Sequence, residues 1–319
     1  MEKQLTFFDN ILTINKPNII IEHGRNLAKS SPIIRINYLL RDLFNFQIIN
    51  PYNLENYKLE TELNNVVISY DSYYSPHNLI NKFIEVNKFR QIFYLINEYN
   101  IEPYPTLKKL LVKKNVIVIC NFENFKRKFN YNRQYMVNLN CLDFQVKAVN
   151  FNAKIYDKLV YWGRYRPNRL KYFNKYFYDI IISCSKQNIN KYKRNLTDFE
   201  NRKIEFKNTL SQTEFEYYLY GLYLEDEFTH QNYNYMAVRW YEALSNKIIM
   251  FFDINCTNTI NKSNYKIPNF LIVKNRKDIE TNKKIIKINE IEELYALYNE
   301  IAKQEKEETI EKLKEIFEI

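Results

Sequence analysis

An arginine and a glutamate three residues apart, Arg239 and Glu242, form the most distinctive polar pair in the sequence. Residues at this spacing share one face of a helix. On such a face a guanidinium can bind a diphosphate bidentately, and a carboxylate one turn further on can accept hydrogen bonds from both hydroxyls of a ribose. The pair therefore predicts a nucleotide-binding site, and an ordinary ion pair on a helix surface is the alternative.

This pair lies between two apolar runs, Leu219–Leu224 and Lys247–Asp253, which we predict to be strands. The first run leads directly into an acidic triplet that contains Asp226, and His230 follows a few residues later. Ligands of open α/β sheets bind at the carboxyl ends of strands, and helix N-termini attract phosphate. We therefore add Asp226 and His230 to the candidate donor-binding residues.

Three arginines, Arg164, Arg166 and Arg169, lie within six residues beside Gly163 and Pro167. Their charges repel one another unless an anion or several carboxylates lie beside them. The cluster predicts a phosphate site on a loop that enters a helix. The aromatic residues around it also suit stacking on the bases of a nucleic acid, so that alternative stays open.

Candidate proton-transfer residues follow two apolar runs in the first half of the chain. Asp71 comes directly after Val66–Tyr70, and His23 comes directly after Asn18–Glu22. A carboxylate at the end of a strand is well placed to act as a general base toward an acceptor hydroxyl. A turn or helix-capping role for Asp71 is the alternative.

The elements that would position these residues are short apolar runs separated by helical patterns. Runs that are apolar throughout indicate strands covered on both faces, as in parallel sheets. The other predicted strands are Ile92–Asn97, Val116–Asn121, Tyr178–Ser183 and Phe270–Val273, and the predicted helices are Leu27–Phe44, Asn78–Phe89, Arg169–Tyr176, Asn232–Leu244 and Ile291 to the end. The alternation predicts an α/β protein with two Rossmann-like, doubly wound domains.

Composition excludes several classes of protein. With only 3 glycines in 319 residues, the chain can contain neither a G-x-G-x-x-G dinucleotide motif nor a P-loop. The 4 cysteines never form C-x-x-C, which indicates a reducing compartment. No run approaches the ~18 apolar residues of a membrane span, and no signal peptide is recognised. We expect a cytoplasmic monomer that does not bind membranes.

The positive charge is concentrated in one part of the chain. The net charge is +10, and the stretch from Lys126 to Lys207 holds 19 basic and 6 acidic residues. A localised basic block suits a polyanion such as nucleic acid, and a general contribution to solubility is the alternative. The candidate phosphate contacts to DNA are Lys126, Arg127, Lys128 and Arg133.

The stretch Tyr161–Asp253 resembles the nucleotide-sugar half of GT-B glycosyltransferases, and is similar to the phage DNA glucosyltransferases that act on 5-hydroxymethylpyrimidines. The resemblance implies that Arg239 and Glu242 bind the diphosphate and the ribose of UDP-glucose, with Arg164 and Arg169 also on the diphosphate. It implies a hexosyltransferase with a UDP-sugar donor and double-stranded DNA carrying hydroxymethylated bases as acceptor. No D-x-D motif occurs, so we expect no metal in donor binding.

The same resemblance implies how the chain is divided. Residues 1–150 would form the acceptor-side domain and residues 151–300 the nucleotide-sugar domain, the two facing a cleft. Residues 301–319 would form a C-terminal helix that packs back on the first domain.

Other interpretations of the sequence stay open. Asp198, Glu205 and Lys207 form a D…E-x-K pattern, which nucleases use to hold Mg²⁺. A nucleic-acid-binding protein without catalysis would need only the basic block. A GT-B enzyme with an acceptor other than DNA is the third alternative.

Overall fold

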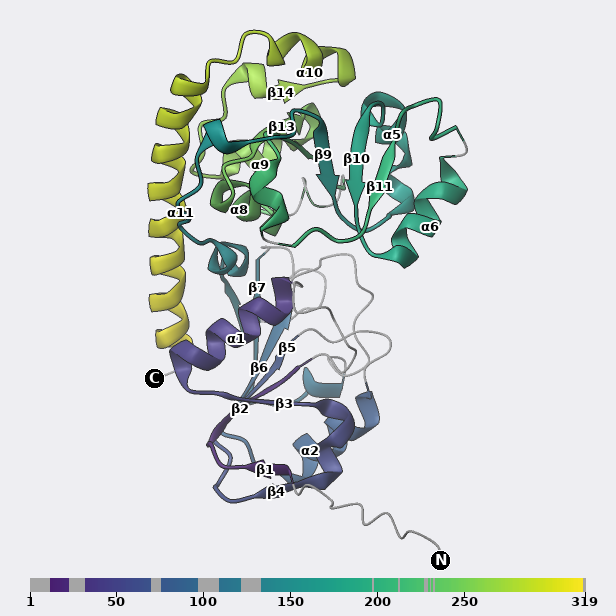
Figure 1. Cartoon of the computed structure of the whole chain (residues 1–319). Coiled ribbons are helices and arrows are strands. Elements are labelled where there is room, and N and C mark those ends of the chain that lie inside the picture. The colour runs from purple at the N-terminus through teal and green to yellow at the C-terminus, as the bar shows by residue number, and fades with distance from the viewer. Residues whose placement is uncertain are drawn as a thin grey trace, which may run out of the picture. The chain divides into compact units, whose positions relative to one another are not determined.

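The computed structural model describes residues 12–22, 32–69, 76–96, 109–121, 133–196, 198–211, 213–226, 229, 231 and 233–317. The chain forms two compact units. Unit 1 contains residues 1–120, 125–136 and 314–319, and unit 2 contains residues 121–124 and 137–313. Each unit is built on one six-stranded sheet with helices beside it (Figure 1).

The sheet of unit 1 is parallel throughout, with strands in the order β3-β2-β5-β6-β7-β8. Its strands are β2 (Asn18–Ile21), β3 (Gln47–Ile49), β5 (Asn65–Ser69), β6 (Gln91–Ile96), β7 (Val116–Cys120) and β8 (Gln134–Met136). A small parallel pair is formed by β1 (Leu12–Ile14) and β4 (Tyr57–Leu59), and the helices are α1 (Pro32–Phe44), α2 (His77–Val86) and the 3₁₀ helix η1 (Pro51–Asn56). β3 lies on one side of β2, and the strands from β5 to β8 follow one another on its other side. The switch point of this sheet therefore lies between β2 and β5.

The sheet of unit 2 is also parallel, in the order β11-β10-β9-β12-β13-β14. Its strands are β9 (Leu159–Trp162), β10 (Ile180–Ser183), β11 (Glu205–Lys207), β12 (Tyr220–Tyr223), β13 (Ile249–Asp253) and β14 (Ile272–Val273). This is the Rossmann order, and its switch point lies between β9 and β12.

The helices of unit 2 cover both faces of its sheet. The α-helices are α5 (Leu170–Tyr176), α6 (Lys186–Asn195), α8 (Val238–Ser245), α9 (Thr257–Lys262), α10 (Arg276–Lys283) and α11 (Ile288–Phe317). The short 3₁₀ helices are η2 (Leu139–Asp143), η3 (Phe151–Ala153), η4 (Pro167–Arg169), η5 (Glu214–Tyr217), η6 (Ile254–Cys256) and η7 (Asn269–Leu271).

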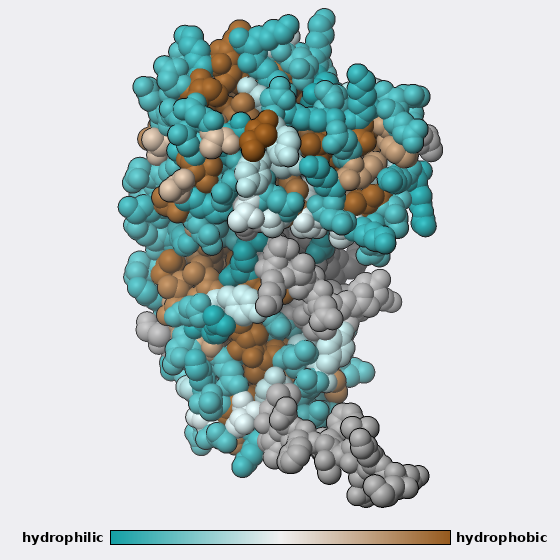
Figure 2. Space-filling model, in the orientation of Figure 1, coloured by the Kyte–Doolittle hydropathy of each residue, from teal (hydrophilic) through white to brown (hydrophobic). Residues whose placement is uncertain are grey.

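Aromatic side chains dominate the core of unit 2. Trp240 of α8 is buried, and its ring meets those of Phe252 on β13 and Tyr298 on α11. The hydroxyl of Tyr295 donates to the carbonyl of Ile248 at 2.6 Å, which ties α11 to the start of β13. The face seen in Figure 2 is mostly hydrophilic, with apolar residues in separate patches.

The last turn of α11 belongs to unit 1. There the ring of Phe317 packs edge-on against Phe44, Phe46 and Phe93, with centroids 4.8–5.4 Å apart. One continuous helix therefore contributes side chains to the cores of both units.

The predicted fold class, α/β with parallel, helix-covered sheets, is confirmed, and every predicted strand is present. Six strands were not predicted: β1, β3, β4, β8, β9 and β11. β9 was missed because it is a run of only four residues that directly precedes the loop of the arginine cluster. Helix α8 begins at Val238 and not at Asn232, and α6, α9 and α10 were missed because they contain too few apolar residues to show a helical period. None of the helices in the described part of the chain is long and apolar enough to span a membrane.

Candidate functional site

The arginine cluster and the acidic residues lie side by side because β9 and β12 are neighbours in the sheet. The two strands pair in parallel, with Val160 opposite Gly221. Their carboxyl ends therefore lie at the same edge of the sheet. β9 leads into the loop with Gly163 and the arginines, and β12 leads into Glu225 and Asp226. This is the position at which ligands bind in open α/β sheets.

Arg169 is buried at the centre of this edge, with 3% of its side chain exposed. Its guanidinium donates to Glu225 at 2.6 Å, to Asp226 at 2.7 Å and to the hydroxyl of Tyr161 at 2.7 Å. Each of its three nitrogens thus has a protein partner. The sequence left open whether an anion or several carboxylates offset the repulsion among the clustered arginines. For Arg169 the carboxylates of Glu225 and Asp226 do so.

Arg166 approaches the same acidic pair from its exposed side. Its Nη1 atom lies 2.6 Å from Asp226, and 33% of its side chain is exposed. Asp226 therefore bridges Arg166 and Arg169. Burial acts to raise the pKa of Asp226, but the two arginines outweigh burial and hold that pKa below its ordinary value.

Arg239 extends from α8 into the same network, which we call the arginine–carboxylate network: Arg166, Arg169, Arg239, Glu225 and Asp226. Its Nε donates to the carbonyl of Trp162 at 2.8 Å, and its Nη1 donates to the carbonyl of Leu224 at 2.9 Å and to Glu225. The guanidinium thereby joins the end of β9 to the end of β12. Burial acts to raise the pKa of Glu225, and Arg239 and Arg169 together lower it.

Gly163 makes this approach possible. A Cβ atom at this position would lie 2.6 Å from Nη2 of Arg239 and 3.1 Å from the hydroxyl of Tyr161. The first separation is too short for any side chain. A glycine at the end of β9 is therefore a steric requirement of the network.

Glu242 lies one turn along α8 from Arg239, and both are 9% exposed. Its Oε2 accepts a hydrogen bond from the indole nitrogen of Trp162 at 2.8 Å. Arg239 and Glu242 therefore hold the backbone and the side chain of the same residue at the end of β9. The alternative of an exposed helix-surface ion pair is wrong, because both side chains are buried.

Arg164 differs from the other three arginines. Its side chain is exposed, and it has no hydrogen-bond or ion-pair partner among the residues that the structure describes. The loop around it is nonetheless held in place by α6. The amide of Tyr165 donates to Asn188 at 3.0 Å, and the hydroxyl of Tyr192 donates to the carbonyls of Gly163 and Arg164 at 3.4 and 3.3 Å. Arg164 is thus a cation on a fixed backbone, available to an anionic ligand.

Six predicted site residues lie outside the described residues: His23, Asp71, Lys126, Arg127, Lys128 and His230. Arg133 is described and exposed, and it directly precedes β8 in unit 1. Glu22, at the end of β2, was not considered from the sequence. It is half-buried, and burial raises its pKa.

Sequence reasoning missed Tyr161, Trp162 and Glu225 as parts of the site. Tyr161 and Trp162 were assigned to the segment of the arginine cluster, although Leu159–Trp162 is an apolar run that could have been recognised as a strand. Glu225 was noted as the first residue of an acidic triplet, but nothing in the sequence shows that it, more than Asp226, pairs with Arg239.

The three residues of the D…E-x-K pattern have separate partners. Asp198 pairs with Arg202 at 2.6 Å and Glu205 with Lys158 at 2.6 Å, while Lys207 donates to the hydroxyl of Tyr218 at 3.0 Å. Among the described residues, no group of three or more His, Cys, Asp and Glu side chains could hold a metal ion. These pairings disfavour a nuclease-type metal site in this part of the chain.

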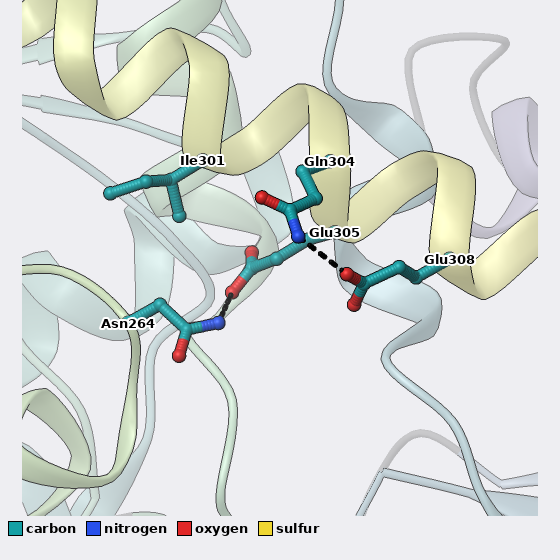
Figure 3. Close-up of a pocket in the computed structure, with 5 residues that line it drawn as sticks. All are labelled: Asn264, Ile301, Gln304, Glu305 and Glu308. Carbon is teal, nitrogen blue, oxygen red and sulfur yellow. Dashed lines mark hydrogen bonds between the residues drawn. The ribbon is translucent and has the colours of Figure 1, made fainter.

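A cavity of about 370 Å³ lies along α11 and includes none of the network residues (Figure 3). It is lined by Asn264, Ile301, Gln304, Glu305 and Glu308. Glu305 accepts hydrogen bonds from Tyr241 at 2.8 Å, Tyr265 at 2.9 Å and Asn264 at 3.2 Å, and burial raises its pKa. With two carboxylates and no cation in its lining, this cavity is unsuited to an anionic nucleotide.

Comparison with known proteins gives matches in structure alone. No protein-family model matches the sequence, and no curated protein does. An alpha-glucosyltransferase in complex with UDP and a 13-mer DNA containing an HMU base is similar with a TM-score of 0.54 and 11% identity, over 91% of this chain and 94% of that one.

Two further solved structures have comparable similarity. An alpha-glucosyltransferase in complex with UDP and a 13-mer DNA containing a central A:G mismatch gives a TM-score of 0.53 at 11% identity, over 93% and 95% of the two chains. WaaG, a glycosyltransferase involved in lipopolysaccharide biosynthesis, gives 0.50 at 8% identity, over 94% and 98%. These matches confirm that the chain has the GT-B fold predicted from the resemblance.

Proposed function

We propose that the protein transfers glucose from UDP-glucose to the hydroxyl of a hydroxymethylated pyrimidine in double-stranded DNA. The observation that carries the proposal is the unpaired Arg164, held at the switch point of a Rossmann-ordered sheet beside a network that already satisfies the other arginines. The alpha-glucosyltransferases of similar fold, which were solved with UDP and DNA, support the choice of donor and acceptor.

In this proposal Arg164 binds the diphosphate of the donor. Four arginines and three carboxylates (Glu225, Asp226 and Glu242) meet at this edge of the sheet, so one positive charge is left over in the part of the site that is described. A diphosphate would place its negative charge against that surplus. Arg166, one-third exposed and paired with Asp226 at the same edge, is the second candidate contact.

The arginine–carboxylate network has a positioning role. All three nitrogens of Arg169, and Nε and Nη1 of Arg239, donate to protein acceptors, so we assign these guanidiniums to fixing the ends of β9 and β12 and assign ligand binding to the neighbouring loop. Glu242 is the candidate for the ribose hydroxyls, since its carboxylate lies at the same edge of the sheet, beside Trp162 at the end of β9. His230 is the remaining donor-site candidate.

The proposed reaction breaks the bond between C1 of glucose and the β-phosphate oxygen, and forms a bond from C1 to the acceptor oxygen. The electron pair of the broken bond leaves with UDP, where a guanidinium stabilises the new charge. The acceptor hydroxyl loses its proton to a base, for which we propose Asp71, with His23 as the second candidate. Lys126, Arg127, Lys128 and Arg133 are the proposed phosphate contacts to DNA.

The test is to incubate the full chain with UDP-glucose and three duplexes of one sequence: plain, with 5-hydroxymethylcytosine, and with 5-hydroxymethyluracil. Two quantities are measured in the same reaction: the UDP that is released, and the glucose found in the DNA after its digestion. Transfer to a hydroxymethylated duplex and none to the plain one is the expected result. UDP-glucose binding without transfer to any of the three would refute the DNA acceptor and leave a GT-B enzyme with another acceptor. A ligand at 100 times its Kd should stabilise the protein by about 2.7 kcal/mol, and no stabilisation by UDP or UDP-glucose would refute the donor.

A further inference from the structure

Helix α6 of unit 2 presents an outward face of unusual charge. Its ten residues, Lys186–Asn195, include four basic residues and no acidic one. Tyr192 is the buried residue of the helix and packs against Phe173 of α5 and against Phe177, which directly follows α5. The outward surface of the helix carries Arg194 roughly opposite Tyr192, with Lys186, Lys191 and Lys193 on its flanks, all exposed.

These cations lack acidic partners. Lys186, Lys191 and Arg194 have no hydrogen-bond or ion-pair partner among the described residues, and the ammonium of Lys193 lies over the rings of Phe199 and Phe206 at 5.4 and 5.5 Å. The nearest acidic residues along the chain are in the following turn, where Asp198 is paired with Arg202. A solvated helix face normally mixes both signs of charge, so this face is adapted to an anionic partner.

The side of α6 that carries Tyr192 packs against the loop of the candidate donor site. The first turn of α6 holds the loop of Arg164 through the bond from Tyr165 to Asn188 at 3.0 Å. Tyr192, in the middle of the helix, donates to the carbonyl of Arg164 itself. The loop that carries the exposed Arg164 is therefore held by the basic helix, which follows β10 in the chain.

The side chains exposed on α6 favour a phosphate backbone over an anionic membrane as the partner. Between the basic residues it exposes amide side chains, Gln187 and Asn190, which hydrogen-bond readily to phosphate and sugar oxygens. No large apolar side chain of α6 is exposed, so the helix has nothing to insert into a lipid bilayer. An extended array of phosphates fits this surface better than an anionic membrane does.

We propose that the outward face of α6, defined by Lys186, Lys191, Lys193 and Arg194, is a docking surface for the phosphate backbone of duplex DNA. It would hold the duplex beside Arg164 without reading its sequence, because the contacts go to the backbone. The proposal rests on the DNA acceptor of the proposed function and assigns that acceptor a surface on the nucleotide-binding unit.

The test compares two triple variants that remove equal charge. In the first, Lys186→Gln, Lys191→Gln and Arg194→Gln neutralise the α6 face. In the control, Lys274→Gln, Lys277→Gln and Lys284→Gln neutralise three exposed lysines on and beside α10 of the same unit. Affinity for a labelled, unmodified 20-base-pair duplex is measured by fluorescence anisotropy from 50 to 200 mM salt, together with UDP affinity and thermal unfolding.

The α6 variant should bind the duplex at least about tenfold more weakly at 50 mM salt. The slope of log K against log[salt] should become less negative by about 2.7, since each lost phosphate contact accounts for about 0.9. The control variant should retain the wild-type slope, and both variants should bind UDP and unfold as the wild type does.

The outcomes separate this proposal from the one on which it rests. Wild-type binding to the duplex with an unchanged slope in the α6 variant would overturn the α6 surface and leave the DNA acceptor standing. A wild type that binds no duplex at 50 mM salt would overturn both. Binding to phosphatidylserine vesicles, lost in the α6 variant, with no binding to duplex would identify the face as a membrane surface and overturn the proposal.

Discussion

The carboxylates at the switch points of the two sheets have pKa values that are shifted in opposite directions. In unit 2, Glu225 and Asp226 at the end of β12 are buried among arginines, and their pKa values are lowered although burial acts to raise them. In unit 1, Glu22 at the end of β2 is half-buried, and burial raises its pKa. The neighbouring strand β5 ends at Ser69, whose hydroxyl donates to Asn37 at 2.5 Å.

The contrast shows that the corresponding edges of two similar sheets differ in their electrostatics. The edge of unit 2 is highly charged but nearly neutral overall, and its buried ion pairs fix the backbone around one free arginine. Under the proposed function, this one arginine on a preorganised backbone would bind the diphosphate. At the edge of unit 1, burial raises the pKa of Glu22, and the neighbouring pair of Ser69 and Asn37 is uncharged.

The largest expected effect is on turnover: removing the proposed general base in unit 1 should impair catalysis without weakening donor binding in unit 2. Asp71→Asn should lower kcat by a factor of about 10²–10⁴, because a positioned general base is lost. UDP affinity should stay unchanged, since the donor is assigned to unit 2. Steady-state glucosyl transfer and isothermal titration with UDP measure the two quantities. A kcat near that of the wild type would show that Asp71 is not the base. The His23→Gln variant then tests the second candidate in the same assay.

The second prediction concerns the buried charges of unit 2. Glu225→Gln should lower the free energy of unfolding by about 3–5 kcal/mol, because Arg169 and Arg239 would be left buried without a full counter-charge. The two tryptophans, Trp162 and Trp240, both lie in unit 2, so their fluorescence in a denaturant titration follows this unit alone.

The matched control for Glu225 is Glu205→Gln, which breaks the largely exposed pair with Lys158. It should cost no more than about 1 kcal/mol. Equal effects of the two substitutions would contradict the conclusion that the network fixes the switch point.

The third prediction tests which arginine binds the donor. Arg164→Ala should reduce kcat/KM by about 10²–10³, the usual effect of removing one group that stabilises developing charge. Its unfolding should match that of the wild type, because its side chain has no described partner. Arg169→Ala is the contrasting variant, expected to destabilise unit 2 strongly. Normal turnover in a folded Arg164→Ala protein would rule out Arg164 as the diphosphate ligand.

The fourth prediction concerns the glycine that admits Arg239. Gly163→Ala should destabilise unit 2 by about 1–3 kcal/mol, the typical cost of overpacking a buried position. The cause can be verified with a double-mutant cycle, since the added Cβ would meet Nη2 of Arg239 at 2.6 Å. In an Arg239→Ala background the same substitution should cost markedly less. Additive effects would show that the contact with Arg239 is not the source of the cost.

The smallest effect is a difference in pH dependence between the units. Glu225 and Asp226 have pKa values below the ordinary 4.5 and 3.8, so they stabilise unit 2 above those values and lose this contribution as the pH falls through their folded pKa. Glu22 has a raised pKa, so its contribution to unit 1 is present at low pH and is lost as the pH rises.

Acidification below about pH 4.5 should therefore destabilise unit 2, measured by tryptophan fluorescence, and Glu225→Gln should flatten this dependence. Hydrogen exchange of peptides covering β2 and β5 follows unit 1. There Glu22→Gln should raise protection at pH 7 slightly, by less than about 1 kcal/mol. The same pH trend in both units would contradict the electrostatic contrast.

The sequence by itself determined the local elements. The apolar runs of β5, β6, β7 and β13 have no alternation of polar residues, and such runs are stable only when both faces are covered, so they predicted parallel strands correctly. Residue types also showed that the three clustered arginines need counter-charges, but left open whether an anion or carboxylates supply them.

Only the tertiary structure decided which of these residues meet. Arg239 pairs with Glu225, fourteen positions away, and not with Glu242 on its own helix, because β9 and β12 are adjacent and α8 covers their ends. Spacing along a helix shows which side chains share a face, but strand order decides what that face meets, and strand order depends on contacts between segments distant in the sequence. For the same reason Arg164 could not be distinguished from Arg169 in the sequence, since three-dimensional packing buries one guanidinium among carboxylates and leaves the other exposed.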